Sequence, residues 1–235
     1  MNISKQDHCN HSSNWRRAFN RVAPLAVAAS LFLVAFGALA TAQYQDRFHD
    51  RDDRDYDRVP LRVSHQQVAV DFGGGHGGRP SPDAMCNEQA LAVGFHVQTG
   101  EYYNQAWLDC AHVRHEGGLG DDIRMTERTG SPGGRPVHDA YCRRGFVLRG
   151  LVGRTGASID EAVGMCSPLR EIAQRFDNPH TEMTQSVTRP YPGGRPTQAV
   201  CPAGSAVTGF RSNSGEYMDH LWLLCSEVHR EHDRD

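Results

Sequence analysis

The chain has 235 residues, with 25 Lys or Arg and 28 Asp or Glu, and a formal net charge of −3 at pH 7. Without residues 1–42 the basic residues number 25 − 4 = 21 and the acidic ones 28 − 1 = 27, which leaves a net charge of about −6. A chain of this charge is a poor partner for nucleic acid or for an anionic membrane.

Residues 1–42 predict a secretory signal peptide. A basic stretch containing Arg16-Arg17 precedes the apolar run Ala23–Ala40, and Ala40-Thr41-Ala42 has the small residues of an A-x-A cleavage site. The arginine pair partly fits a twin-arginine signal. The alternative is an uncleaved anchor, because the apolar run is about long enough to span a bilayer. We therefore expect a periplasmic or extracellular protein that has no membrane insertion after cleavage.

The next segment, QYQDRFHDRDDRDYDRVP at 43–60, alternates acidic and basic residues and has few apolar ones. It cannot bury enough surface to offset the chain entropy lost on folding, so we predict a disordered linker. The tail 229–235 is similar and is also predicted to be disordered. Residues 61–228 remain, which is enough chain for one domain with a sizeable core.

The domain contains one motif three times. The copies are CNEQALAVGFHVQTGEYYNQAWLDC, CRRGFVLRGLVGRTGASIDEAVGMC and CPAGSAVTGFRSNSGEYMDHLWLLC, each with 23 residues between its cysteines. Glycine recurs eight and fourteen residues after the first cysteine, and Gly-Gly-Arg-Pro precedes each copy. Self-similarity of this kind indicates a repeated supersecondary unit. We place the repeat cores at 73–113, 129–169 and 189–228.

Each copy predicts a β-hairpin, because LAVGFHV, FVLRGLV and SAVTGFR are typical of strands and the segments leading to the second cysteine are their return strands. The glycine of each connecting turn is expected to supply a backbone conformation that other residues avoid. On the return strands, alternation predicts two faces. The inward residues are Ala106, Leu108, Ala162, Gly164, Leu221 and Leu223, and the outward ones are Gln105, Glu161 and His220. We also expect a short helix at 167–176, capped by Ser167.

Six cysteines follow the signal segment, which itself contains Cys9, and an even number in an exported chain indicates disulfides. If the third hairpin turns near residue 214, Cys225 faces about residue 204, close to Cys201. We therefore predict one disulfide within each repeat, worth about 3–4 kcal/mol each by the chain-entropy estimate. The predicted pairs are Cys86–Cys110, Cys142–Cys166 and Cys201–Cys225. Pairing between repeats is the alternative, since spacing alone does not fix connectivity.

The turn sequences TGEYYN, TGASID and SGEYMD, together with the Gly-Gly pairs, resemble the loops of jacalin-related lectins, especially griffithsin-like ones. The cysteine frame, as in CPAGSAVTGF, resembles the vitelline membrane outer layer protein I family. Both resemblances imply an all-β fold, a β-prism of three antiparallel sheets with threefold repetition. A β-trefoil is the alternative fold, although its Gln-x-Trp signature is absent.

The lectin resemblance implies up to three weak carbohydrate sites. A carboxylate can accept charge-assisted hydrogen bonds from two neighbouring sugar hydroxyls, and glycines let backbone approach the ring. The implied carbohydrate-binding residues are Asp219, Tyr217, Gly215, Asp160, Gly156, Asn104 and Gly100. The glycine-rich loops are Gly77, Gly78, Gly133, Gly134, Gly193 and Gly194. Asn104 lacks charge, so the first site is expected to be weaker or inactive. No cofactor, metal or catalytic residue is implied.

The alternative function is a structural or protein-interaction component of the cell envelope or extracellular matrix, with a surface protein rather than a glycan as partner. Gly-x-x-x-Asp at a hairpin apex is also ordinary turn chemistry, because Asp and Asn accept hydrogen bonds from nearby backbone amides. The arginines at 79, 135 and 195 depart from the griffithsin-like loop and either block the sugar site or pair with an acidic sugar.

Other motifs are weaker. His112-Val-Arg-His115 and the later His229 and His232 lack the other half of a metal site. Trp107 and Trp222 occupy equivalent positions and either cover an outer sheet face or mark a partner surface. No nucleophile elbow or His-Glu-x-x-His motif occurs, so we do not expect an enzyme.

Overall fold

The structure is a computed structural model, and it describes residues 60–188 and 193–231. The predicted signal peptide, the predicted linker up to residue 59 and the last four residues of the predicted tail lie outside this part of the chain. None of the helices in the described ranges is both long and apolar enough to cross a membrane.

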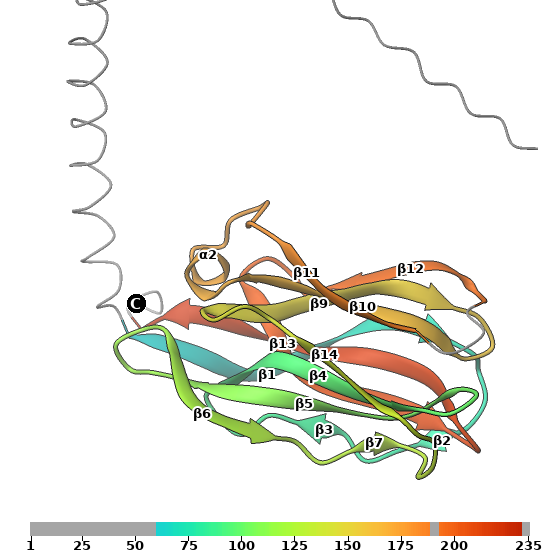
Figure 1. Ribbon diagram of the computed structural model, residues 1–235. Helices are drawn as coiled ribbons and strands as arrows, with labels where there is room; N and C mark the ends of the chain where they lie inside the picture. Colours follow the sequence, from blue (N-terminus) through green and yellow to red (C-terminus); the bar gives the residue numbers. More distant parts are fainter. Residues whose placement is uncertain (1–59, 189–192, 232–235) are drawn as a thin grey trace, which may run out of the picture. The chain divides into compact units, whose positions relative to one another are not determined.

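Three antiparallel sheets form the domain, each built around one predicted hairpin (Figure 1). The hairpins are β4 (Ala90–Thr99) with β5 (Tyr103–Val113), β9 (Phe146–Thr155) with β10 (Ile159–Pro168), and β13 (Ser205–Ser214) with β14 (Met218–Arg230). We call the sheet that contains β4 and β5 sheet B, the one that contains β9 and β10 sheet C, and the one that contains β13 and β14 sheet A. The predicted β-prism is confirmed, and the β-trefoil alternative is not what the chain adopts.

Each hairpin is flanked by further strands. Sheet A adds β1 (Leu61–Gly74) beside β14, and β2 (Arg79–Pro80) and β3 (Ala84–Met85) beside β13. Sheet B adds β6 (Leu119–Met125) and β7 (Thr129–Gly130) beside β5, and β8 (Val137–Tyr141) beside β4. Sheet C adds β11 (Glu182–Thr188) beside β10 and β12 (Arg195–Val200) beside β9. The hairpins of sheets B and C thus take their flanking strands from the chain that follows, whereas sheet A takes them from the start of the domain.

The sheets enclose a shared apolar core, and the predicted alternation of the return strands accounts for it. All six residues expected to face inward are buried, with Leu108 and Leu223 fully so. The rings of Phe95 and Phe210 meet edge to face at 6.4 Å, so sheets A and B pack directly against each other.

His220 lies on the outward face as expected, but it is buried there rather than exposed to solvent. Its Nε2 lies 2.7 Å from Asp71 Oδ1 and its Nδ1 lies 3.0 Å from the Gly75 carbonyl oxygen. Its ring also packs 4.1 Å from that of Trp222. Strand β1 therefore covers this position, which the hairpin pattern alone does not reveal.

All three predicted disulfides are confirmed, with Cα–Cα distances of 5.6–5.7 Å. The reasoning about register was less accurate, because Cys225 faces Val207 and not residue 204. A tight turn, in which the Ser205 amide donates to the Pro202 carbonyl, folds Cys201 back over the strand. The pairing holds although the register is shifted by three residues.

The repeated glycine eight residues after each first cysteine is explained by a neighbouring strand. A Cβ at Gly94 would lie 2.7 Å from the Tyr141 ring, and one at Gly209 would lie 2.5 Å from Met85 Sδ. At Gly150 the neighbour is the Ala199 carbonyl oxygen, at 2.5 Å. A flanking strand pairs with each hairpin at this glycine, so a side chain there would push that strand away.

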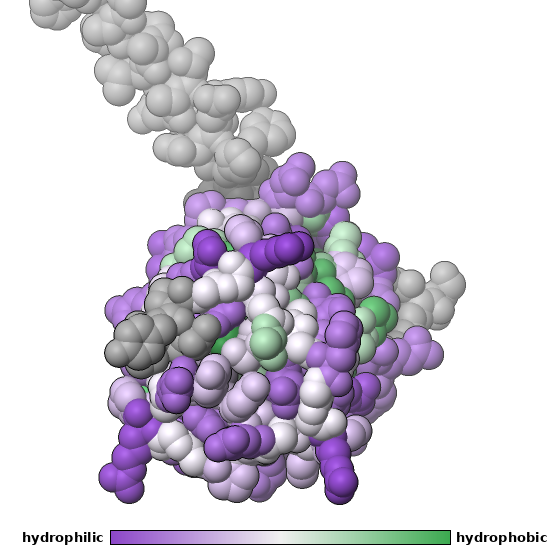
Figure 2. Space-filling view, turned by 90° about the vertical axis from the view of Figure 1, so that its right-hand side faces the viewer, coloured by the Kyte–Doolittle hydropathy of each residue, from purple (hydrophilic) through white to green (hydrophobic). Residues whose placement is uncertain are grey.

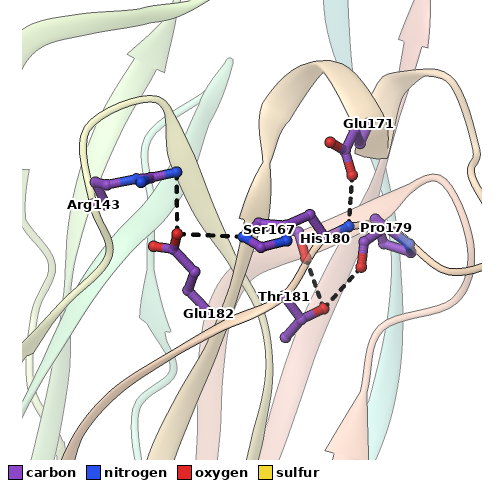
Figure 3. A network of polar contacts seen from close by, with 7 residues as sticks. All are labelled: Arg143, Ser167, Glu171, Pro179, His180, Thr181 and Glu182. Carbon is purple, nitrogen blue, oxygen red and sulfur yellow. Dashed lines mark hydrogen bonds and ion pairs between the residues drawn. The ribbon is translucent and has the colours of Figure 1, made fainter. Parts of the chain in front are cut away.

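The expected helix is shorter than predicted. Helix α2 spans Leu169–Ala173, its N-cap is Pro168, and no side chain caps it. Ser167 instead lies 3.3 Å from Thr181 in a polar network that ties the chain after α2 to the sheets (Figure 3). The other members of that network are Arg143, Glu171, Pro179, His180 and Glu182.

The two ends of the domain meet in sheet A. Leu61 pairs with Arg230, and the Glu231 amide donates to the Pro60 carbonyl at 3.0 Å. Strand β14 therefore continues two residues beyond the boundary expected at 228, because β1 supplies it with a partner.

Candidate functional site

The three hairpin turns lie at one end of the domain, on the right in Figure 1. In sheet A this turn is SGEYMD, residues 214–219. The Gly215 amide donates to Asp219 Oδ2 at 2.9 Å, and the Gly75 amide donates to the Asp219 main-chain carbonyl at 2.8 Å. Asp219 is only 9% exposed, so its own turn holds the carboxylate in place.

A Gly-Gly pair packs against this carboxylate. A Cβ at Gly78 would lie 2.6 Å from Asp219 Oδ2 and 2.6 Å from the Ser214 carbonyl carbon, and Gly78 has φ +73°. A Cβ at Gly77 would lie 2.8 Å from Asp219 Oδ1. A side chain at Gly78 would meet backbone, whereas one at Gly77 would meet only the Asp219 carboxylate. We call the arrangement of Gly-Gly pair and sixth turn residue the cradle.

Sheets B and C repeat the cradle. In sheet B, Gly134 has φ +80° and its Cβ would lie 2.4 Å from Asn104 Oδ1. In sheet C, Gly194 has φ +67° and its Cβ would lie 2.4 Å from Asp160 Oδ2. The structure thus places each of these side-chain oxygens against the second glycine of a Gly-Gly pair, in all three sheets.

The cradles combine parts of the sequence that the repeat analysis kept apart. The repeat cores defined from the sequence group each Gly-Gly pair with the hairpin that follows it. In the structure, the pair at 77–78 adjoins the turn at 214–219, the pair at 133–134 adjoins 99–104, and Gly194 adjoins 155–160. This follows from the strand order. The segment that contains each Gly-Gly pair runs beside a different hairpin from the one that comes next in the sequence.

The turn glycines also have a different role from the expected one. The left-handed φ values occur at the second glycine of each pair, and Gly100, Gly156 and Gly215 do not have them. A Cβ at Gly100 or Gly156 would lie 3.3 Å from the Cα of Gly134 or Gly194, respectively. These turn glycines therefore allow two backbones to approach closely, rather than supplying an unusual conformation.

The fifth turn residue, which the sequence analysis did not consider, closes the core beneath each cradle. Tyr103, Ile159 and Met218 are at most 1% exposed. The Tyr103 hydroxyl donates to the Val187 carbonyl oxygen, and burial raises the pKa of this phenol well above its usual value. The sequence signal for this core role is the large, mainly apolar residue that precedes the Asp or Asn in each turn.

The fourth turn residue differs between sheets. Tyr217 stacks on Tyr102, with ring centroids 4.4 Å apart, and the Ser131 hydroxyl donates to the Gly215 carbonyl. The turns of sheets A and B are thereby joined. The corresponding residue in sheet C is Ser158, which is buried. The aromatic surface expected from Tyr217 is therefore a stacked pair of rings, Tyr217 and Tyr102, rather than a single ring.

The tryptophans cover the outer faces of their sheets. Trp107 is 4% exposed and lies between the His96 ring, at 5.1 Å, and the Arg128 guanidinium, at 4.2 Å. Trp222 packs against His220. Among the described residues, no three His, Cys, Asp or Glu side chains gather as a metal site would require.

No protein-family model and no curated protein matches the chain. Solved structures that resemble it include wild-type Malaysian banana lectin, with 15% identity, a TM-score of 0.45 and coverage of 70% of this chain and 99% of that one. Artocarpin complexed with Me-alpha-mannose has 12% identity, a TM-score of 0.48 and coverage of 69% and 99%. AcmJRL, a mannose-binding jacalin-related lectin from Ananas comosus, has 14% identity, a TM-score of 0.45 and coverage of 68% and 96%.

These neighbours are lectins. Their likeness to this chain is one of architecture, and at TM-scores below 0.5 it says nothing about which residues bind a ligand here. The chemistry of the cradles rests on the residues of this chain.

Proposed function

We propose that this protein is an exported, non-catalytic carbohydrate-binding protein with up to three weak sugar sites, one at each cradle. The observation that supports this is that an Asp or Asn oxygen lies against the second glycine of a Gly-Gly pair in all three sheets. Such a cradle offers an acceptor for sugar hydroxyls and has no side chain that would keep a ring away.

The geometry of the cradle in sheet A supports this proposal. The Gly215 amide engages Asp219 Oδ2, while an exposed glycine, Gly77, lies over Oδ1. The Cβ that Gly77 lacks would sit 2.8 Å from that oxygen, so its absence leaves room for a hydroxyl there. A carboxylate held in this way accepts a charge-assisted hydrogen bond without having to reorganise.

Three cradles at one end of a disulfide-linked domain favour multivalent binding. Weak sites that act together on one glycan surface can gain about 10²–10⁴ in avidity. The three disulfides are compatible with an oxidising compartment. Export through the predicted signal peptide would bring the domain to glycans in the periplasm or outside the cell.

Gly77→Ala tests the proposed function directly. The added methyl group fills the space over Asp219 Oδ1, and Gly77 has no left-handed φ that the substitution would strain. We expect the purified protein to bind a coherent set of glycans on an array of neutral and acidic sugars, and Gly77→Ala to weaken that binding. Gly120→Ala, on β6, is the matched control that should bind as the parent does. An absence of any glycan binding by the parent at high surface density would refute the proposal.

A second function, that of a structural or protein-binding component of the envelope or matrix, is favoured by one observation. Asp160 and Asp219 are 2% and 9% exposed, and Asp219 already accepts a hydrogen bond within its turn. If the cradles serve only their turns, Gly77→Ala will change stability at most, and the binding partner will be a protein.

A further inference from the structure

Three arginines beside the cradles have no side-chain partner among the residues that the structure describes. Arg79, Arg135 and Arg195 each follow a Gly-Gly pair, and all three are exposed. Within residues 60–188 and 193–231, none of their side chains makes an ion pair, a hydrogen bond or a ring contact. The same residue type is thus left unpaired at the same place in all three repeats.

Arginines elsewhere in the described chain are mostly engaged. Arg154 donates to the Gly193 and Gly194 carbonyls, and Arg128 lies over the Trp107 ring. Those paired with a carboxylate are Arg62, Arg114, Arg124, Arg143, Arg144, Arg175 and Arg211. Arg149 also lacks a partner at its Nε, but that atom is buried, whereas Arg79, Arg135 and Arg195 are exposed. Since the chain has more acidic than basic residues, a shortage of carboxylates does not explain the unpaired guanidinium groups of these three.

The register of the sheets puts each arginine next to its turn. Arg79 is paired with Ser214, the first residue of the turn in sheet A, and Arg195 is paired with Thr155 in sheet C. In sheet B the Thr99 amide donates to the Pro136 carbonyl at 3.0 Å, which places Arg135 beside the remaining turn. Figure 2 faces this end of the domain and shows a largely hydrophilic surface.

We propose that the cradles select acidic sugars. The Asp or Asn oxygen receives ring hydroxyls, and the adjacent arginine binds an oxyanion carried by the same sugar, either a carboxylate or a sulfate. A guanidinium suits this role because it forms two parallel hydrogen bonds with such a group. The inference rests on the proposed function and adds the class of ligand.

The three cradles differ in how well they suit an anion. Exposed glutamates, Glu101 and Glu216, occupy the third turn position in sheets B and A, and Ala157 occupies it in sheet C. A nearby carboxylate repels an acidic ligand. Sheets B and C carry one carboxylate each, Glu101 and Asp160, whereas sheet A carries two, Glu216 and Asp219. The cradle of sheet A is therefore expected to bind the anion least well, and Arg79→Gln to cause the smallest single loss.

The test compares acidic ligands with their neutral counterparts on the full chain. Oligogalacturonate is paired with its methyl ester, and dextran sulfate with dextran. We expect at least one acidic ligand to bind with at least about ten times the affinity of its neutral counterpart. A factor of ten corresponds to about one charge-assisted contact. The triple variant R79Q/R135Q/R195Q should lose that preference.

A control variant, R114Q/R124Q/R144Q, removes the same charge from exposed arginines that are already paired with carboxylates. It should retain the preference for the acidic ligand, and circular dichroism should show both variants folded. Equal losses in the two variants would overturn the inference, because they would indicate general electrostatic attraction. Binding of neutral glycans alone, unchanged in the triple variant, would also overturn it but leave the proposed function standing. Binding of no glycan at all would remove both.

Discussion

The cradles of sheets A and B have the same geometry but a different acceptor. In sheet A the atom next to the second glycine is a carboxylate oxygen of Asp219, and in sheet B it is the amide oxygen of Asn104. The glycines themselves, Gly78 and Gly134, have φ values of +73° and +80°. The turn thus places a side-chain oxygen at its sixth position next to the second glycine, and that oxygen need not carry a charge. A binding function that needs the negative charge of Asp219 would therefore be stronger in sheet A than in sheet B.

The same two sheets differ beneath the cradle. Met218 in sheet A and Tyr103 in sheet B both fill the core, but only Tyr103 brings a hydroxyl, which donates to Val187 of sheet C. Sheet B therefore depends on a buried hydrogen bond where sheet A depends on packing alone. This contrast can be tested separately from any question of ligand.

The largest effect is expected from Gly78→Ala and its counterpart Gly134→Ala. A left-handed φ costs a non-glycine residue about 1–2 kcal/mol, and the close approach of the new Cβ to backbone adds about 1–3 kcal/mol. Both variants should lose roughly 3 kcal/mol of unfolding free energy in urea titrations, because the cradles share one geometry.

Gly145→Ala separates these two costs. Gly145 has φ +83°, yet nothing lies within 4 Å of its missing Cβ. It should lose only about 1–2 kcal/mol, the cost of the backbone conformation alone. If all three variants lose the same amount, the close packing of the glycine pairs is not what the cradle requires.

The next effect concerns Tyr103 and alkaline pH. Burial raises the pKa of its phenol above the usual value of 10, so the unfolded chain releases this proton at a lower pH than the folded one. Its stabilising contribution is therefore complete below pH 10 and is lost as the pH rises, at up to about 1.4 kcal/mol per pH unit. Tyr103→Phe should remove that slope between pH 10 and 11, at a cost of about 1 kcal/mol at neutral pH.

Met218→Leu in sheet A is the control, since it changes a residue that does not titrate. Urea titrations at pH 8, 10 and 11 should give this variant the same pH slope as the parent. Equal slopes for the parent and Tyr103→Phe would show that Tyr103 does not control the alkaline transition.

The pattern of cysteines, glycines and apolar alternation was enough to predict the hairpins and the disulfides. Leu108 and Leu223 share a face with Cys110 and Cys225, and that alternation is local, so the sequence displays it directly. The disulfide pairing tolerated a register error of three residues because a turn at Pro202 brings Cys201 back to its partner.

The composition of each cradle could not be obtained in this way. Gly77 and Gly78 meet Asp219 only because β1 and β2 flank the last hairpin of the chain, some 140 residues later. Nothing in the local sequence distinguishes this arrangement from the one in which each Gly-Gly pair serves the next hairpin. The burial of His220 was missed for the same reason, since Asp71 reaches it from β1.

A smaller effect is expected from Asp219→Asn, which gives sheet A the acceptor that sheet B has naturally. The amide oxygen can still accept from Gly215, so stability should fall by no more than about 1 kcal/mol. On the proposed sugar site the charge-assisted bonds to hydroxyls are lost, and affinity should fall about tenfold by calorimetry with the glycan identified on the array. Unchanged affinity in a folded variant would exclude Asp219 from binding.

The smallest effect is expected from the reverse change, Asn104→Asp in sheet B. Its oxygen already occupies the position next to Gly134, so the substitution adds charge to an existing geometry and stability should change by less than about 0.5 kcal/mol. On the proposed site the new carboxylate should raise the affinity of sheet B for a neutral glycan about threefold, below the full value of a charge-assisted bond because Glu101 is nearby. Calorimetry of Asn104→Asp in an Asp160→Asn, Asp219→Asn background isolates this one cradle. A gain there would show that charge, and not the shape of the turn, limits the site in sheet B, whereas no gain would mean that the cradle of sheet B serves only its turn.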